Sequence, residues 1–398
     1  MAASTEHQKA GGFRPMTIDP RFNAVAERFF TMFPTPARGG GALAVYFHGE
    51  LVLDLWAGWA APDRRWTSDT VSLCFSTGKG VASTVLHRLA DRGLVGYDDP
   101  VAQHWPEFAQ AGKERITVRE LMSHRAGLHR VLGLVPGPRG LLDVDAVARA
   151  LAASPPDPRR LKGPGYHAVT YGSLVAELAS RITGRDFTDL VRTELEEPLG
   201  VDGLWFRVPP EERHRIARVF PKVNPVPLPW HATGRVMTRV PGLRNIAEAG
   251  MAEGFDVLAR SDDVHDVAMP GWNGVFFAPA LAKMYAALAD GGSVGDVRLL
   301  SPDTVEQLLE VQTRERDYVL GIRPNWRLGY HPGWVRLEEQ PLRSVGHYGF
   351  GGSGAFADPE TGIAISFVTN RLGNKIQPIT DGRMSRLGAS AVYVARRL

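Results

Sequence analysis

The order of the predicted elements indicates an α+β fold, an α/β sandwich in which one antiparallel sheet is flanked by helices. Two short apolar runs, residues 42–49 and 51–58, surround Gly49-Glu50 and predict a β-hairpin near the amino terminus. The last third of the chain predicts strands over residues 327–330, 333–337, 353–357 and 363–370, followed by a helix over 381–397. Because strands at both ends of the chain must bury their apolar faces, we expect them to share one sheet.

The middle of the chain, residues 101–274, predicts mainly helices separated by connections rich in proline and glycine. We therefore expect an N-terminal extension over residues 1–20, an α/β domain formed by 21–100 and 275–398, and an inserted, mainly helical domain over 101–274. A chain of 398 residues is long enough for two such lobes. A cleft between the lobes is the expected place for a binding site.

The composition excludes several classes of function. The net charge is only +3, and no basic run provides the footprint of a nucleic-acid-binding protein. No apolar stretch approaches the roughly 20 residues of a membrane span, so none is expected. Cys74 is the single cysteine and lies in an apolar run, which excludes an intramolecular disulfide and a cysteine-based metal site.

The N-terminal residues are polar and small, without the basic and apolar regions of a signal peptide, so we expect a cytoplasmic protein. We expect no metal and no cofactor. A small-molecule partner is expected, with homo-oligomers left open.

A serine and a lysine three positions apart are the first candidates for chemistry. Ser76 directly precedes a predicted helix over residues 77–92, and Lys79 lies in its first turn; an apolar run comes before both. Residues three apart share one helix face, and an amine held out of water lowers the cost of deprotonating a neighbouring hydroxyl. Of the seven lysines in the chain, only Lys79 has a serine three places before it. The alternative is a surface lysine on a helix.

A turn rich in glycine and proline, residues 163–172, precedes a predicted helix over 173–184 and carries two tyrosines. Tyr166 is the candidate that projects into the cleft, and Tyr171 is the reserve candidate. A phenol acts as a base only if nearby cations lower its pKa, and Lys79 could supply such a cation. The alternative is that both tyrosines are packing residues.

A second glycine-rich segment, residues 346–354, leads into the predicted strand 353–357. Glycines on a strand allow a ligand to approach the backbone closely, and a free backbone N–H there can face a developing oxyanion. The alternative is a bulged, glycine-rich hairpin that binds no ligand.

Three other patterns are interpreted as structural. Residues 291–295 match G-x-S-x-G, but they follow a predicted helix over 279–289 and lack the strand-to-helix context of a nucleophile elbow. His124 and His129 do not have helical metal-ligand spacing, and we expect them to be structural or to lie at the cleft rim. The polar residues 262–266 are interpreted as a solvated loop.

Taken together, these motifs resemble those of the β-lactamase-related serine hydrolases, and within them the family VIII carboxylesterases, which are built like class C β-lactamases and penicillin-binding proteins. Ser76 and Lys79 match the S-x-x-K motif. Tyr166 stands at the place of the Tyr-x-Asn motif, and residues 347–349 stand at the place of the Lys-Thr-Gly strand motif. The resemblance runs from about residue 20 to the end, and segments 93–100, 118–128, 197–200 and 358–362 agree with it.

The resemblance implies a β-lactamase/transpeptidase-like fold and a role for each residue. Ser76 would be acylated, while Lys79 and Tyr166 would share its proton and pass it to the leaving group. The backbone N–H groups of Ser76 and Phe350 would form the oxyanion hole. His347 and Gly349 would line the substrate cleft beside it.

Two departures from the class C pattern narrow the expected substrate. Ala168 stands where those enzymes have asparagine, and His347 stands where they have the lysine that pairs with the β-lactam carboxylate. A histidine is mostly neutral near pH 7. We therefore expect a carboxylesterase for short to medium acyl chains. A β-lactamase or D-alanyl-D-alanine carboxypeptidase, an acyltransferase, and a catalytically silent binding protein remain the alternatives.

Overall fold

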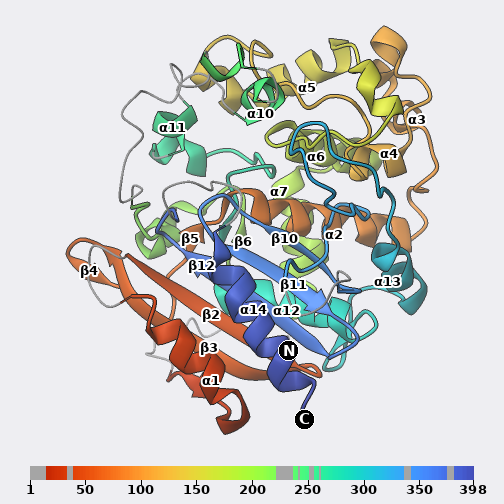
Figure 1. The fold of residues 1–398 in the computed structure, drawn as a ribbon. Helices are drawn as coiled ribbons and strands as arrows, with labels where there is room; N and C mark the ends of the chain where they lie inside the picture. The colour runs from red at the N-terminus through yellow and green to blue at the C-terminus, as the bar shows by residue number, and fades with distance from the viewer. Residues whose placement is uncertain are drawn as a thin grey trace, which may run out of the picture.

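One antiparallel sheet contains strands from both ends of the chain, which confirms the predicted α+β fold (Figure 1). The computed structural model describes residues 15–33, 39–220, 236–240, 243–250, 255–259, 261–335, 342–373 and 381–398. The strand order is β1-β3-β2-β12-β11-β10, and β4 also pairs with β3. These strands are β1 Thr17–Ile18, β2 Gly40–Phe47, β3 Glu50–Ala61, β4 Arg64–Arg65, β10 Val345–Tyr348, β11 Gly354–Asp358 and β12 Ile363–Thr369. The N-terminal hairpin therefore joins the C-terminal strands through the β2–β12 pairing.

Helices cover both faces of this sheet (Figure 1). On one face, α1 (Asn23–Phe30) and α14 (Gly382–Ala395) contact each other and bury the large apolar side chains of the strands. On the other face, α12 (Ala278–Ala289) lies against β2, β11 and β12. The strands present small side chains to α12, namely Ala42, Ala44, Ala355, Ala357 and Ala364. Because both faces are buried, the strands are apolar along nearly their whole length.

Most of the helices over residues 101–258 lie in the part of the molecule drawn above the sheet in Figure 1, together with short 3₁₀ turns. The helices not yet given are α2 Gly78–Asp91, α3 Val101–His104, α4 Val118–Met122, α5 Val144–Ala153, α6 Thr170–Thr183, α7 Phe187–Val191, α8 Glu197–Leu199, α10 Arg244–Gly250, α11 Phe255–Leu258 and α13 Pro302–Leu309. Two small sheets complete the strands, with β5 Ser72–Leu73, β6 Leu204–Trp205 and β7 Val275–Phe276 in one and β8 Ser293–Val294 and β9 Val297–Arg298 in the other.

The predicted hairpin forms between β2 and β3, with its turn at His48 and Gly49. Both turn residues have a positive φ, 47° and 78°, as a tight two-residue hairpin of the type I′ class requires. The predicted helices over 279–289 and 381–397 correspond to α12 and α14. The predicted strands over 353–357 and 363–370 correspond to β11 and β12.

The strand predicted over residues 327–330 is wrong. The chain turns there, with Gly329 at φ 79°, and its carbonyls bond to α2 instead of to a neighbouring strand. His87 Nε2 lies 2.9 Å from the Leu328 carbonyl oxygen, and Thr84 Oγ1 lies 2.7 Å from Tyr330 Oη. Residues 333–335 are not a strand either, although the neighbouring His331 forms an isolated bridge with Gly346; residues 336–337 of that prediction lie outside the described ranges.

Two further points concern the chain as a whole. The domain boundaries at 100/101 and 274/275 stay a proposal, and residues 1–14 of the expected N-terminal extension lie outside the described ranges. None of the helices in the described ranges combines the length and the apolar character that crossing a membrane would need.

Candidate active site

The turn before α2 leaves Ser76 partly exposed within an otherwise buried segment. Phe75 has a φ of 48°, a left-handed conformation that is uncommon for an aromatic residue and marks local strain. Ser76 lies in the 3₁₀ turn Phe75–Thr77 and is partly exposed, whereas its neighbours Phe75 and Thr77 are buried. The hydroxyl of Ser76 is therefore accessible on a backbone that is held in place on both sides.

Lys79 is completely buried and contacts three oxygen atoms. Its Nζ lies 2.9 Å from Ser76 Oγ, 2.7 Å from the carbonyl oxygen of Ala168 and 2.5 Å from the carbonyl oxygen of Gly271. A neutral amine has two N–H groups and one lone pair. The two carbonyls can only accept, so they take both N–H groups and leave the lone pair for the hydroxyl of Ser76.

Burial lowers the pKa of the Lys79 amine well below its ordinary value, because the charged form loses its hydration. None of its three contacts is a carboxylate that would restore the ammonium form. The amine is therefore prepared to accept the proton of Ser76.

Tyr166 lies beside the serine and the lysine. Lys79 Nζ is 5.2 Å from the centroid of its ring. Burial raises the pKa of the Tyr166 phenol above its ordinary value, although a hydrogen bond with the Ser76 side chain lowers it in part. The expectation that Lys79 lowers the pKa of this tyrosine is thus not met: the pKa is raised overall, and the group that lowers it in part is Ser76. The phenol keeps its proton and can donate it.

Tyr171, the reserve candidate, points away from Ser76. It is fully buried in α6, and its hydroxyl lies 2.8 Å from Ser83 Oγ, further along α2. Burial raises the pKa of this phenol as well. The structure therefore brings Tyr166, and not Tyr171, to the serine and lysine.

Gly349 brings the end of β10 against the Phe75–Thr77 turn. A Cβ atom at this position would lie 2.1 Å from the Cys74 carbonyl oxygen and 2.7 Å from Thr77 Oγ1, so only glycine fits. The Phe350 ring packs edge-on against the Phe75 ring, with centroids 5.6 Å apart. Ser76 and Phe350, whose N–H groups we expect to form the oxyanion hole, therefore belong to adjoining segments.

His347 lies beside Tyr166, with ring centroids 6.2 Å apart, and is 2% exposed. Its Nδ1 lies 3.0 Å from the carbonyl oxygen of Tyr348, which can only accept, so Nδ1 carries the proton. Burial lowers the pKa of this imidazole well below its ordinary value, with His331 and Lys79 adding to the effect. Nε2 is left as an acceptor without a hydrogen-bond partner in the described part of the chain.

Sequence reasoning missed the groups that hold these side chains. Lys79 is oriented by the carbonyls of Ala168 and Gly271, and a backbone carbonyl leaves no signal in a sequence. The turn that presents Gly271 is held by Asn273, which is fully buried. The Asn273 amide nitrogen donates to the carbonyls of Phe206, Val264 and Val267. A lone polar residue in an apolar run was the only available sign.

The patterns set aside in the sequence lie elsewhere. Ser293 begins β8 in a short hairpin, so the G-x-S-x-G match has no strand-to-helix elbow. His124 and His129 are buried. No group of three or more histidine, cysteine, aspartate or glutamate residues in the described ranges is arranged to hold a metal ion.

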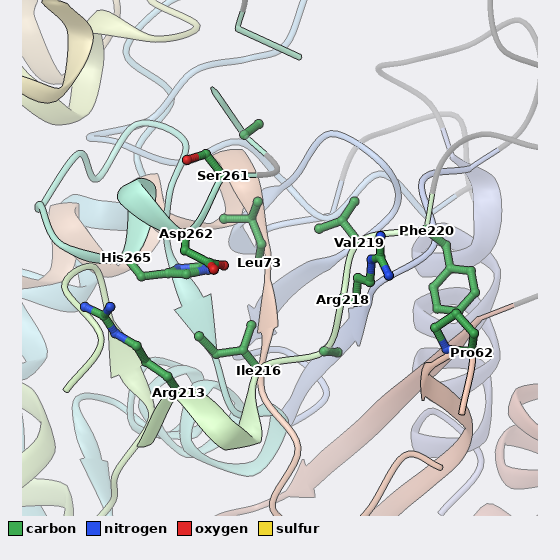
Figure 2. Close-up of a pocket in the computed structure, with 12 residues that line it drawn as sticks. Pro62, Leu73, Arg213, Ile216, Arg218, Val219, Phe220, Ser261, Asp262 and His265 are labelled. Carbon is green, nitrogen blue, oxygen red and sulfur yellow. The ribbon is translucent and has the colours of Figure 1, made fainter. Parts of the chain in front are cut away.

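A separate pocket of about 750 Å³ lies beside β5 (Figure 2). Leu73, Ile216 and Val219 form part of its apolar wall, and Asp262 and His265 lie on another side. Leu73 is three positions before Ser76, but none of Ser76, Lys79 and Tyr166 lines this pocket. Residues 262–266, predicted as a solvated loop, contain the 3₁₀ turn Asp262–His265 and border a pocket apart from Ser76, Lys79 and Tyr166.

Comparison with known proteins identifies the class. The profile of the Beta-lactamase family matches residues 26–386, and the chain therefore belongs to the β-lactamase family. It is 40% identical over 377 residues to "Esterase/beta-lactamase LipL" of Mycobacterium tuberculosis, which covers 89% of this chain and 82% of that protein. The chain is thus a hydrolase of the esterase and β-lactamase kind.

Solved structures agree with this family. A penicillin-binding protein homologue from Caulobacter crescentus has a TM-score of 0.81 at 31% identity and covers 96% of this chain and all of its own. A family VIII carboxylesterase has a TM-score of 0.80 at 30% identity, and the match covers 96% of this chain and 98% of that protein. The β-lactamase and penicillin-binding-protein fold implied by the motifs is thereby confirmed.

Proposed function

We propose that this protein is a serine carboxylesterase that hydrolyses uncharged esters of short to medium acyl chains through an acyl-enzyme on Ser76. The observation that carries the proposal is the contact between Lys79 Nζ and Ser76 Oγ, 2.9 Å, in which a buried amine has its N–H groups occupied by two carbonyls. Relatives named as an esterase/β-lactamase and as a family VIII carboxylesterase support it.

Acylation begins when the Ser76 hydroxyl gives its proton to the Lys79 amine. Oγ then forms a bond to the ester carbonyl carbon, and the carbonyl oxygen becomes an oxyanion. In the proposal, the backbone N–H groups of Ser76 and Phe350 donate to this oxyanion. The bond to the leaving alcohol breaks as the tetrahedral intermediate collapses.

Tyr166 supplies the proton that the leaving alkoxide needs. The phenol donates its proton to the departing oxygen and recovers one from the Lys79 ammonium, so the net result is transfer of one proton from Ser76 to the alcohol, with Lys79 and Tyr166 restored. In deacylation a water molecule attacks the acyl carbon, its proton passes to the same two groups, and Ser76 leaves with a proton. Such positioned proton transfer contributes about 10²- to 10⁴-fold in rate.

The neutral His347 favours esters over β-lactams. A β-lactam antibiotic carries a carboxylate, and the imidazole at position 347, whose pKa is lowered by burial, offers it no positive charge. An uncharged ester does not need a cationic partner. The relative named both esterase and β-lactamase makes β-lactam hydrolysis the second candidate function.

A probe and two substrates test the proposal together. A fluorophosphonate probe is expected to label the peptide that carries Ser76, as peptide mass spectrometry would show, and 4-nitrophenyl butyrate is expected to turn over faster than nitrocefin. Labelling of a different serine would reject the mechanism. Faster turnover of nitrocefin would make the protein a β-lactamase instead.

Replacing His347 with lysine is expected to raise kcat/KM for nitrocefin by roughly 10- to 100-fold, the range that one hydrogen bond to a charged group provides. The added ammonium would pair with the substrate carboxylate, while kcat/KM for 4-nitrophenyl butyrate should not rise. His347→Gln is the matched control, since it fills the position without charge. An equal gain in His347→Gln would show that charge at position 347 does not set the preference.

A further inference from the structure

A buried carboxylate lies behind Tyr166 and takes no part in the proposed chemistry. Asp317 is fully buried and comes from a loop 151 residues further along the chain. Its Oδ1 accepts the Tyr166 backbone N–H at 3.1 Å, as well as the N–H groups of Val319 and Leu320. Its Oδ2 accepts the indole N–H of Trp326 at 2.9 Å.

All four partners of Asp317 are N–H donors, so the side chain is matched as a carboxylate with acceptors only. Burial raises the pKa of this carboxyl above its ordinary value, and the N–H donors oppose that effect. A protonated carboxyl would direct an O–H at one of these donors. The carboxylate therefore links the backbone of the Tyr166 turn to the indole of Trp326.

Trp326 fixes the plane of the Tyr166 ring. The two rings are nearly parallel, 11° apart, with centroids 5.4 Å apart, and Trp326 is 1% exposed. Because Asp317 accepts both the indole N–H and the Tyr166 N–H, it contributes to the position of the tyrosine backbone and to the orientation of its ring.

A second contact restrains the same turn from the same loop. The N–H of Tyr318 donates to the Pro164 carbonyl at 3.0 Å. The Tyr318 ring lies over Gly165, where a Cβ atom would come within 2.0 Å of it. The loop thus clamps the turn on either side of the peptide bond that leads into Tyr166.

We propose that Asp317 and Trp326 are positioning residues that direct the Tyr166 phenol toward the leaving-group oxygen. This inference rests on the proposed role of Tyr166 as the proton donor. Neither residue touches substrate, and both act through the tyrosine. Displacement of a reacting group by about 1 Å can cost about 100-fold in rate, so loss of the contacts that Asp317 and Trp326 make with Tyr166 should be visible in the kinetics.

Two variants each disrupt the hydrogen bond between Asp317 and Trp326 from one side. Asp317→Asn keeps an oxygen for the backbone N–H groups but turns an amide N–H toward the indole N–H, so two donors face each other. Trp326→Phe keeps a stacked ring and removes the indole N–H. In the double variant the amide introduced at position 317 no longer meets a donor, so this variant should behave like Trp326→Phe and not like the sum of the two changes.

The readout is the ratio of kcat/KM for ethyl butyrate to kcat/KM for 4-nitrophenyl butyrate. An ethoxide needs a proton to leave, whereas 4-nitrophenolate leaves without one. Poor positioning of Tyr166 therefore lowers the first value more than the second. A variant that is merely less well folded lowers both values alike and leaves the ratio unchanged.

Asp317→Asn is expected to lower this ratio by about 100-fold, and Trp326→Phe by roughly tenfold. Asp91→Asn and Trp105→Phe serve as matched controls, since they alter a partly buried carboxylate bonded to Ser301 and Thr304 and a buried tryptophan packed against Phe108. Both controls should leave the ratio unchanged. If Asp317→Asn does not fold, Trp326→Phe alone carries the test.

Tyr166→Phe distinguishes the proton-donor role of Tyr166 from the positioning role of Asp317 and Trp326. If it lowers the ratio while Asp317→Asn and Trp326→Phe do not, the positioning role is wrong and the proposed function stands. If Tyr166→Phe leaves the ratio unchanged, the proposed role of the tyrosine fails, and this inference fails with it. The positioning role is supported if Tyr166→Phe, Asp317→Asn and Trp326→Phe all lower the ratio and the double variant has the same ratio as Trp326→Phe.

Discussion

Replacing Ser76 with alanine is expected to lower kcat for 4-nitrophenyl butyrate by about 10⁶-fold, which is the loss seen when a serine hydrolase loses its nucleophile. The variant lacks the hydroxyl oxygen that lies 2.9 Å from Lys79 Nζ. Ser76 is partly exposed, so its removal should leave the fold intact. Hydrolysis of the ester is measured by release of 4-nitrophenolate, and thermal unfolding confirms that the variant is folded.

Ser293→Ala is the control for this prediction, because Ser293 is the serine of the other sequence match to a hydrolase motif. It lies in the β8–β9 hairpin and should retain the activity of the unaltered protein. Loss of activity in Ser293→Ala together with retention in Ser76→Ala would move the nucleophile to that hairpin and overturn the proposed site.

Replacing Lys79 with methionine is expected to lower kcat/KM by about 10⁴-fold, the upper range for a general base. Methionine fits a fully buried position but cannot accept the proton of Ser76. Lys79→Arg is the sharper variant, since arginine keeps a positive charge at all relevant pH values and offers no lone pair. Both variants should be inactive, and an active Lys79→Arg would show that a cation, not a base, is needed there.

The pH dependence of the unaltered protein belongs to the same prediction. Burial lowers the pKa of Lys79 well below its ordinary value, so the amine becomes neutral at a lower pH than a surface lysine would. The value of kcat/KM should therefore rise with pH through this lowered pKa and level off once the amine is neutral. A rise that occurs only where ordinary lysines titrate would contradict the buried, neutral base.

Local patterns in the sequence were sufficient to predict the elements whose partners are near in the chain. The β2–β3 hairpin and helices α12 and α14 follow from apolar runs and turn residues. The pairing of Ser76 with Lys79 follows from one helical turn. The strand predicted over 327–330 failed because its carbonyls bond to His87 and Ser83 on α2, and such a distant contact leaves no periodicity in the segment itself.

The same limit applies to the site. Whether the pKa of Tyr166 is raised or lowered depends on how completely the ring is buried, which its neighbours in sequence do not reveal. The partners of Lys79 are backbone carbonyls, and the support of Tyr166 comes from Asp317 and Trp326 in a distant loop. The proximity of Ser76, Lys79 and Tyr166 was predictable from residue type and spacing, whereas the groups that orient them depend on the tertiary structure.

The uncharged state of His347 also bears on how the reaction ends. Ester hydrolysis makes a carboxylate at the place where an uncharged substrate was bound. Burial lowers the pKa of both His347 and Lys79, which disfavours the charged forms that would hold the new anion in an ion pair. The same feature that disfavours an anionic substrate therefore promotes release of the acid product and limits product inhibition.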